Sequence, residues 1–135
     1  MNNVKAWAAL AGIVLVAVGL LGFAQNPLVG GALVPADARH NIVHLGTGLL
    51  ALGIAFAMTG KSQVDGMFGF GILYVVIFLA VVVSPTLFGL FWIPANAILH
   101  IIHVALAVVS LGVAYMARSA ASVRLYPGDR HARVP

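Results

Sequence analysis

Long apolar stretches, separated by short polar or proline-containing segments, organise almost the whole of this chain. Capping and helix-breaking residues delimit four of them, and such stretches are long enough to cross a hydrocarbon core of about 30 Å. Lys61 to Asp65 is the one clearly hydrophilic connection. The pattern predicts an all-α, four-helix transmembrane bundle. The expected helices cover residues 4–24, 37–58, 66–83 and 96–118.

The two halves of the chain resemble each other. PADARHNIVH around Pro35 matches PANAILHIIH around Pro94 when one half is moved onto the other by about sixty residues. This register places His44 on His103. We therefore expect two parallel two-helix repeats, at 4–60 and 66–118, within a membrane domain over 1–118. A polar, basic tail over 119–135 follows.

Composition and charge agree with a membrane protein. The chain is 62% hydrophobic and 7% charged, which excludes an ordinary soluble domain. It has no cysteine, which excludes disulfides and thiolate metal sites. The few basic residues flank apolar segments, so the formal charge of +4 suits the lipid bilayer and its anionic headgroups rather than nucleic acid.

The basic residues also predict an orientation. All of them except Arg39 fall on one side of a four-helix arrangement, which the positive-inside rule assigns to the cytoplasm. We expect a multi-pass protein of the bacterial inner (cytoplasmic) membrane with both termini cytoplasmic. Its first apolar run is read as a retained helix and not as a signal peptide. Trp7, Trp92 and Tyr126 are read as interface anchors.

Small and polar residues predict where the helices pack against each other and where two of them begin. Thr47, Ala51 and Ala55 recur at four-residue spacing beside Gly48, which lets helix backbones approach closely in lipid. Asp37 and Asn96 are expected as N-caps of the second and fourth helices. Asp37 and Arg39 are otherwise read as a solvated loop pair.

Four histidines carry the candidate chemistry, because ionisable groups inside a membrane are costly and invite a functional reading. His40 and His44 share one helix face, and His100 and His103 share another. Three interpretations stay open: structural hydrogen bonding, for which Asn41 is a candidate partner; ligation of haem b or a transition metal; and a proton relay. A haem between His44 and His103 fits the repeat.

Three segments resemble a known family: GLLGFAQNPLVGG, RHNIVHLGTGLLALG and ILHIIHVALAVVSLG. They are similar to the bacterial four-helix membrane proteins catalogued as domain of unknown function 4383, over roughly Gly12 to Tyr115. The resemblance implies a four-helix membrane fold but no reaction. The family's second motif fits Asn96 to His100 with one extra residue, so His100 and His103 both stay open as the partner of His44. The family-like positions are Asn41, His44, Gly48 and His100.

These observations predict a non-enzymatic, small multi-pass membrane protein that acts as a structural or accessory subunit. Its expected partners are a larger membrane protein complex or copies of itself. The alternative is a haem- or metal-binding membrane redox protein that uses His44 with His103 or His100. Transport ranks lowest, because the residues expected at the membrane midplane are apolar or small. These are Val16, Leu52, Val76 and Val109.

Overall fold

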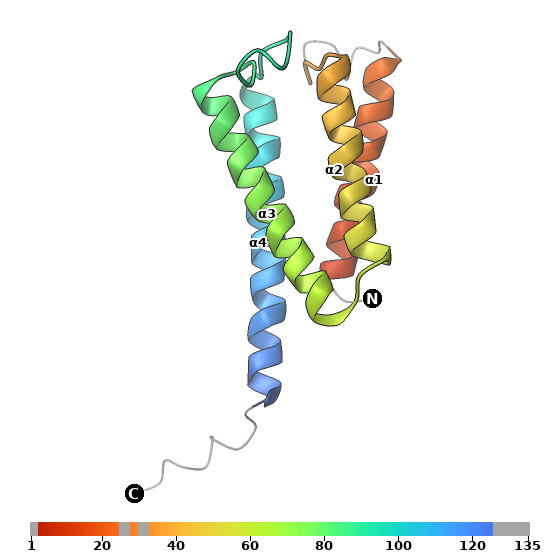
Figure 1. The fold of residues 1–135 in the computed structure, drawn as a ribbon, viewed down its shortest axis with the longest axis vertical. Helices are drawn as coiled ribbons and strands as arrows, with labels where there is room; N and C mark the ends of the chain where they lie inside the picture. Colours follow the sequence, from red (N-terminus) through yellow and green to blue (C-terminus); the bar gives the residue numbers. More distant parts are fainter. Residues whose placement is uncertain (1–2, 25–27, 30–32, 126–135) are drawn as a thin grey trace, which may run out of the picture.

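Four α-helices make up the described part of the chain in this computed structural model (Figure 1). The structure describes residues 3–24, 28–29 and 33–125, the last five by their backbone alone. The predicted all-α, four-helix architecture is confirmed. The helices are α1 (Asn3–Phe23), α2 (Ala38–Phe56), α3 (Gly60–Val83) and α4 (Ala97–Leu125).

The helices form two antiparallel pairs, α1 with α2 and α3 with α4 (Figure 1). The pairs meet chiefly through α1 and α4, with smaller contacts from α3 to α1 and α2. Trp7 Nε1 donates a hydrogen bond of 2.9 Å to Ser110 Oγ and so ties α1 to α4. Trp7, expected as an interface anchor, therefore lies at a helix–helix contact, whereas Trp92 is 67% exposed.

Glycines allow the helices of each pair to approach closely. A Cβ atom added at Gly48 would lie 2.8 Å from the backbone nitrogen of Val16 and 3.1 Å from the carbonyl oxygen of Gly12. A Cβ atom added at Gly71 of α3 would lie 3.1 Å from the backbone nitrogen of Leu111 in α4. The predicted small-residue face of α2 is confirmed, because Thr47, Gly48, Ala51 and Ala55 are all buried.

Both predicted N-caps are confirmed. Asp37 Oδ1 accepts hydrogen bonds from the backbone nitrogens of Arg39 (2.9 Å) and His40 (3.0 Å) in the first turn of α2. Asn96 Oδ1 accepts one of 3.0 Å from the backbone nitrogen of Leu99 in α4. Short polar side chains thus satisfy N–H groups that have no partner inside their own helix.

The expected hydrophilic connection between Lys61 and Asp65 is wrong, because α3 begins at Gly60. Lys61 Nζ pairs with Asp65 one turn later, and Arg118 of α4 binds the other Asp65 oxygen at 2.7 Å. Charged residues therefore occupy the first turns of α3, although the hydropathy pattern alone assigns these positions to a loop. α4 also continues to Leu125, well past its predicted end at Arg118. Tyr126 and the rest of the predicted tail lie outside the described residues.

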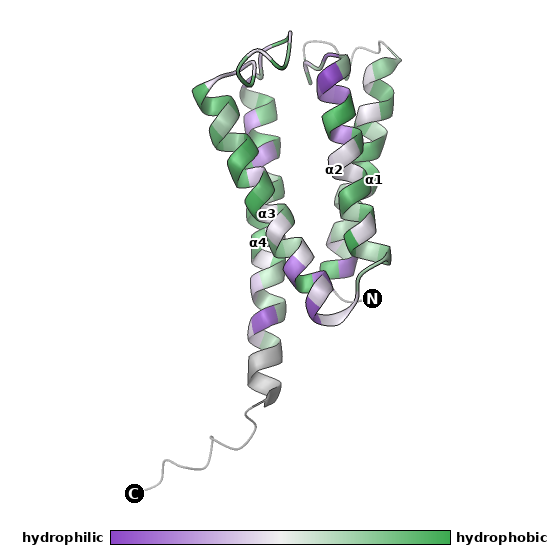
Figure 2. Ribbon diagram, viewed as in Figure 1, coloured by the Kyte–Doolittle hydropathy of each residue, from purple (hydrophilic) through white to green (hydrophobic). Residues whose placement is uncertain are grey.

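Three of the helices are long and apolar enough to cross a membrane: α1, α3, and α4 as far as Ala120. α2 is the exception, because polar residues occupy its first half (Figure 2). The described part of the chain is therefore a helical protein with three candidate membrane spans, and the fourth crossing predicted from the sequence remains a prediction.

The reading of Asp37 and Arg39 as a solvated pair is wrong, because Asp37 is only 8% exposed. Besides capping α2, its Oδ2 atom accepts hydrogen bonds from the backbone nitrogens of Trp92 and Ile93, the latter at 3.1 Å. Arg39 donates to the carbonyl oxygen of Leu90 at 3.1 Å, and its guanidinium lies 4.6 Å from the centre of the Trp92 ring. The two residues therefore fasten α2 to the loop between α3 and α4.

Candidate functional site

Two histidines of α2 stack beneath the loop that Asp37 holds in place. The rings of His40 and His44 lie 4.5 Å apart with an interplanar angle of 17°, one helical turn apart on one face as predicted. Phe91 of the loop stacks on the other side of His40, also at 4.5 Å. Because all three side chains are buried, the loop separates the two imidazoles from solvent.

His103 of α4 belongs to the buried polar groups on the other side of the bundle interior. His44 and His103 are 4% and 3% exposed, and the His103 ring lies 6.0 Å from the ring of Tyr74. The Tyr74 hydroxyl bonds to Thr47 Oγ1, which in turn donates to the carbonyl oxygen of His44. The choice between His100 and His103 as the partner of His44 stays a prediction.

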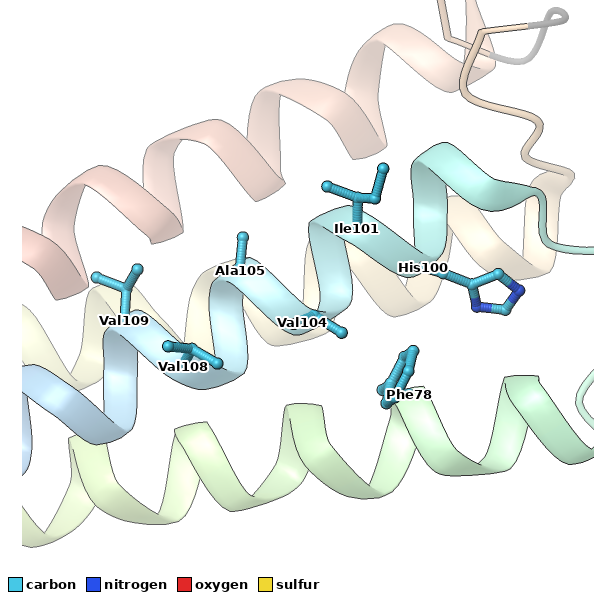
Figure 3. A pocket seen from close by; sticks show the side chains of 7 residues that line it. All are labelled: Phe78, His100, Ile101, Val104, Ala105, Val108 and Val109. Atoms are coloured by element: carbon cyan, nitrogen blue, oxygen red, sulfur yellow. The ribbon is translucent and has the colours of Figure 1, made fainter.

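His100 lies apart from His44. It lines an open groove of about 520 Å³ that runs along α4 and includes Phe78 of α3 (Figure 3). Its ring is 6.0 Å from the Phe78 ring, in an edge-on arrangement. The other residues that line the groove are aliphatic: Ile101, Val104, Ala105, Val108 and Val109.

Each of the four histidines has a buried ring nitrogen without a hydrogen-bond partner among the described residues. These atoms are Nδ1 of His40, His100 and His103 and Nε2 of His44. Asn41, the partner expected from the sequence, packs its side-chain amide against Gly22 of α1, and its Oδ1 atom also lacks a partner in the described chain. Unpaired buried polar atoms cost free energy and call for an explanation, such as an ordered water molecule or a ligand.

Two polar residues that the sequence did not assign to this site, Thr47 and Tyr74, continue the cluster toward the middle of the bundle. Tyr74 Oη of α3 donates a 3.0 Å hydrogen bond to Thr47 Oγ1 of α2, and the Tyr74 ring lies 6.0 Å from the His103 ring. The midplane residues chosen from the sequence included Val76 and Val109, which are 56% and 38% exposed and thus face outward. The missed signal is helical spacing, because Thr47 lies one turn after His44.

The described side chains of the cluster are hydrogen-bonding groups: imidazoles, a hydroxyl and a phenol. A neutral imidazole has one donor nitrogen and one acceptor nitrogen, so it binds either a carbonyl or a hydroxyl group. Within the described residues, no group of three or more His, Cys, Asp or Glu side chains is placed to hold a metal ion. Ligation of a haem or a metal by His44 with His103 stays a prediction.

Comparisons with protein-family models, with curated proteins and with solved structures give no match for this chain. The resemblance to domain of unknown function 4383 therefore rests on the sequence segments quoted above. The residues and the geometry of the helices are therefore the basis for a functional proposal.

Proposed function

We propose that this protein is a small four-pass integral membrane protein that acts as a non-enzymatic subunit of a membrane assembly. The outward side of α2 carries the observation that best supports this role. Gly46 and Gly53 lie two turns apart, and a Cβ atom added at either glycine meets nothing within 4 Å. Exposed glycines at such spacing let a further helix approach closely in lipid. The partner is another copy of the chain or a helix of a larger complex.

The inward position of the polar residues supports a fourth crossing by α2. His40, Asn41, His44 and Thr47 are all buried, so they do not contact lipid, whereas Ile42, Leu49 and Leu50 on the outward side are exposed. With 19 residues α2 is about 28 Å long, close to the thickness of a hydrocarbon core. Its low hydropathy thus reflects a polar face turned toward other helices.

Equivalent burial in the two helix pairs supports a duplicated hairpin. Residues related by the sequence offset of Pro35 and Pro94 are buried together in α1 and α3, and again in α2 and α4. The close approach of Gly12 to Leu52 corresponds to that of Gly71 to Leu111. The buried pairs are Val4 and Gln63, Ala8 and Met67, Ala11 and Phe70, Leu15 and Tyr74, His44 and His103, Ala51 and Ser110, and Ala55 and Ala114.

With four crossings, the positive-inside rule assigns the turn between α2 and α3 to the cytoplasm and the loop between α3 and α4 to the outside. Because the chain has no cysteine, single cysteines at Ser62 and Phe88 report the two sides directly. In sealed inverted vesicles, a membrane-impermeant maleimide is expected to label Ser62→Cys and not Phe88→Cys, and in intact cells the pattern should reverse. Labelling of both sites from the same side would contradict a crossing by α3, and labelling of Ser62→Cys in intact cells would contradict the proposed cytoplasmic turn.

The subunit role predicts that bulky side chains on the outward side of α2 disrupt assembly. Wild-type protein extracted in mild detergent is expected to form a complex whose molar mass, measured by light scattering, exceeds that of the monomer. Gly46→Ile with Gly53→Ile should shift it to the monomer, because the new side chains hold a partner helix away. Gly69→Ile and Gly112→Ile are the matched control, since these glycines are equally open but lie on α3 and α4. A monomeric wild type would overturn the proposal.

A haem- or metal-binding membrane redox protein is the second candidate. The burial of His44 and His103 and their ring nitrogens that have no partner among the described residues favour it. A ligand held between two imidazoles would depend on both equally. In that role His44 and His103 would hold the haem or metal ion, which would supply the redox chemistry.

A further inference from the structure

The loop between α3 and α4, residues 84–96, presents apolar side chains at the end of the bundle opposite Lys61 and Arg118. Leu90, Trp92 and Ile93 are all exposed. No Asp, Glu, Lys or Arg lies between Asp65 and Arg118, so the loop itself carries no formal charge. An exposed, uncharged surface with an aromatic ring is typical of the boundary between lipid headgroups and acyl chains.

Most backbone N–H groups of this loop are already hydrogen-bonded within the protein. They donate to carbonyl oxygens of the loop, to Ser84 Oγ or to the carboxylate of Asp37. Non-helical backbone is tolerated at the level of lipid only where its polar groups have partners. The loop therefore suits the membrane interface. The donors are Leu87, Phe88, Leu90, Phe91, Trp92, Ile93 and Ala95.

Arg39 gives this surface its exposed formal charge. Asp37 and Arg39 are the only charged residues between Lys5 and Lys61. The carboxylate of Asp37 is buried and accepts hydrogen bonds from four backbone N–H groups, two of them in the first turn of α2. The guanidinium of Arg39 is exposed, and one of its five N–H donors bonds to the Leu90 carbonyl oxygen at 3.1 Å. The guanidinium can therefore bind a further anion, whereas the capped helix end cannot.

The length of α4 places Arg39 at the level of the lipid headgroups. About 20 helical residues cross a hydrocarbon core of about 30 Å. Arg118 binds Asp65 at the charged end of the bundle, and the residue twenty positions before it is Ile98, in the first turn of α4. The loop that Arg39 contacts comes directly before α4, so it lies at the opposite boundary of the hydrocarbon core, where lipid phosphate groups are found.

We propose that this end of the bundle binds one anionic phospholipid, with Arg39 bonded to its phosphate group and Trp92 and Ile93 against its acyl chains. A guanidinium forms paired, charge-assisted hydrogen bonds with phosphate. The apolar side chains beside Arg39 select a lipid over free phosphate, because only a lipid brings acyl chains to bury them. Zwitterionic headgroups carry an ammonium that already neutralises their phosphate, so an anionic lipid is preferred. This inference rests on the membrane insertion proposed above and does not depend on the subunit role.

Brominated lipids test the proposal, because bromine quenches indole fluorescence on contact and Trp92 is the only tryptophan of Trp7→Phe protein. This protein is placed in vesicles of phosphatidylcholine with increasing fractions of phosphatidylglycerol brominated near the headgroup end of its acyl chains. Quenching should show about a threefold preference over equally brominated phosphatidylcholine, as expected for one exposed ion pair. Equal quenching by both lipids would overturn the site but leave membrane insertion intact. No quenching by either lipid would contradict insertion as well.

Substitutions identify the group that binds the lipid. In Trp7→Phe protein, Arg39→Gln should abolish the preference, and Arg39→Lys should keep part of it because the charge remains. The matched control is Lys61→Gln, which removes the same charge from the opposite end of α3 and should keep the full preference. Equal loss in Arg39→Gln and Lys61→Gln would point to the total charge of the protein and would overturn the site. The comparison can be repeated with Trp7 present, because Trp7 lies at the contact of α1 with α4.

Salt and free phosphate keep the test independent of protein variants. Sodium chloride at about 1 M shortens the Debye length to about 3 Å and should remove most of the preference for phosphatidylglycerol. Sodium phosphate and sodium chloride at equal, low ionic strength should leave the same preference, since free phosphate brings no acyl chain. A preference that survives high salt would overturn the role of the Arg39 charge. A preference lost only in phosphate would show that Arg39 binds phosphate without a lipid and would overturn the lipid assignment.

Discussion

Gly48→Val is expected to lower the free energy of unfolding by about 2–3 kcal/mol, the cost of overpacking a close helix contact. The added Cβ atom meets the backbone of α1 at Val16 and Gly12, and a backbone cannot move aside as a flexible side chain can. α1 and α2 must therefore separate along their contact. Unfolding in sodium dodecyl sulfate, followed by circular dichroism, measures the change.

Gly46→Val is the matched control for this variant. It lies two residues away on α2, and an added Cβ atom there meets nothing within 4 Å, so the stability of the monomer should stay within about 0.5 kcal/mol of the wild type. In the second helix pair, Gly71→Val and Gly69→Val should repeat the contrast, because Gly71 lies against Leu111 and Gly69 is open. Equal stabilities of Gly48→Val and Gly46→Val would contradict the close packing of α1 on α2.

Asp37→Ala is expected to lower the free energy of unfolding by about 2–3 kcal/mol. It removes the N-cap of α2, worth about 1 kcal/mol, and the charged acceptor of the Trp92 and Ile93 N–H groups. Asp37→Asn should cost less, because an amide oxygen still caps the helix, as that of Asn96 caps α4. The same denaturant titration measures both variants, and a loss of under 0.5 kcal/mol in Asp37→Ala would contradict the contacts described.

The stability that Asp37 provides should also depend on pH in a defined direction. Burial of the carboxyl group raises its pKa, but the backbone N–H groups of His40, Trp92, Ile93 and Arg39 together lower the pKa below its ordinary value of 3.8. The contribution is thus present above pH 3.8 and is lost as the pH falls through the pKa of the folded state. Wild type should therefore lose more stability in that acidic range than Asp37→Asn, in which the carboxyl group of Asp65, bonded to Lys61 and Arg118, still titrates.

The sequence was sufficient for the features that depend on local chemistry. Hydrophobic length and breaking residues predicted the four helices, and the capping preferences of Asp and Asn predicted the roles of Asp37 and Asn96. The start of α3 was missed, because charges at positions 61–65 suggest a loop although Asp65 pairs with Lys61 and Arg118. That stabilisation includes a residue of α4, which local hydropathy does not contain.

The sequence predicted which histidines belong to the candidate site better than it predicted how the side chains are arranged. The internal similarity related His44 to His103, and the structure buries both, His44 stacked on His40 and His103 beside Tyr74. Depth in the membrane alone does not identify the residues that face the bundle interior, because Val76 and Val109 are exposed whereas Thr47 and Tyr74 bond to each other inside it. Which face of a helix turns inward depends on its neighbours, so depth has to be combined with helical phase. A cavity of about 270 Å³ between α1 and α4, with His44 among its lining residues, depends on side chains of both helices and has no sequence signature.

The attachment of Arg39 to the loop between α3 and α4 has a consequence for biogenesis in a four-pass chain. No Asp, Glu, Lys or Arg lies between Asp65 and Arg118, so the second hairpin is translocated without moving a formal charge across the bilayer. The first hairpin carries Asp37 and Arg39, whose charges cancel. Its arginine gains the Leu90 carbonyl and the Trp92 ring only after the second hairpin has been inserted. The first half of the chain therefore reaches its full set of contacts only after the second half has been synthesised and inserted.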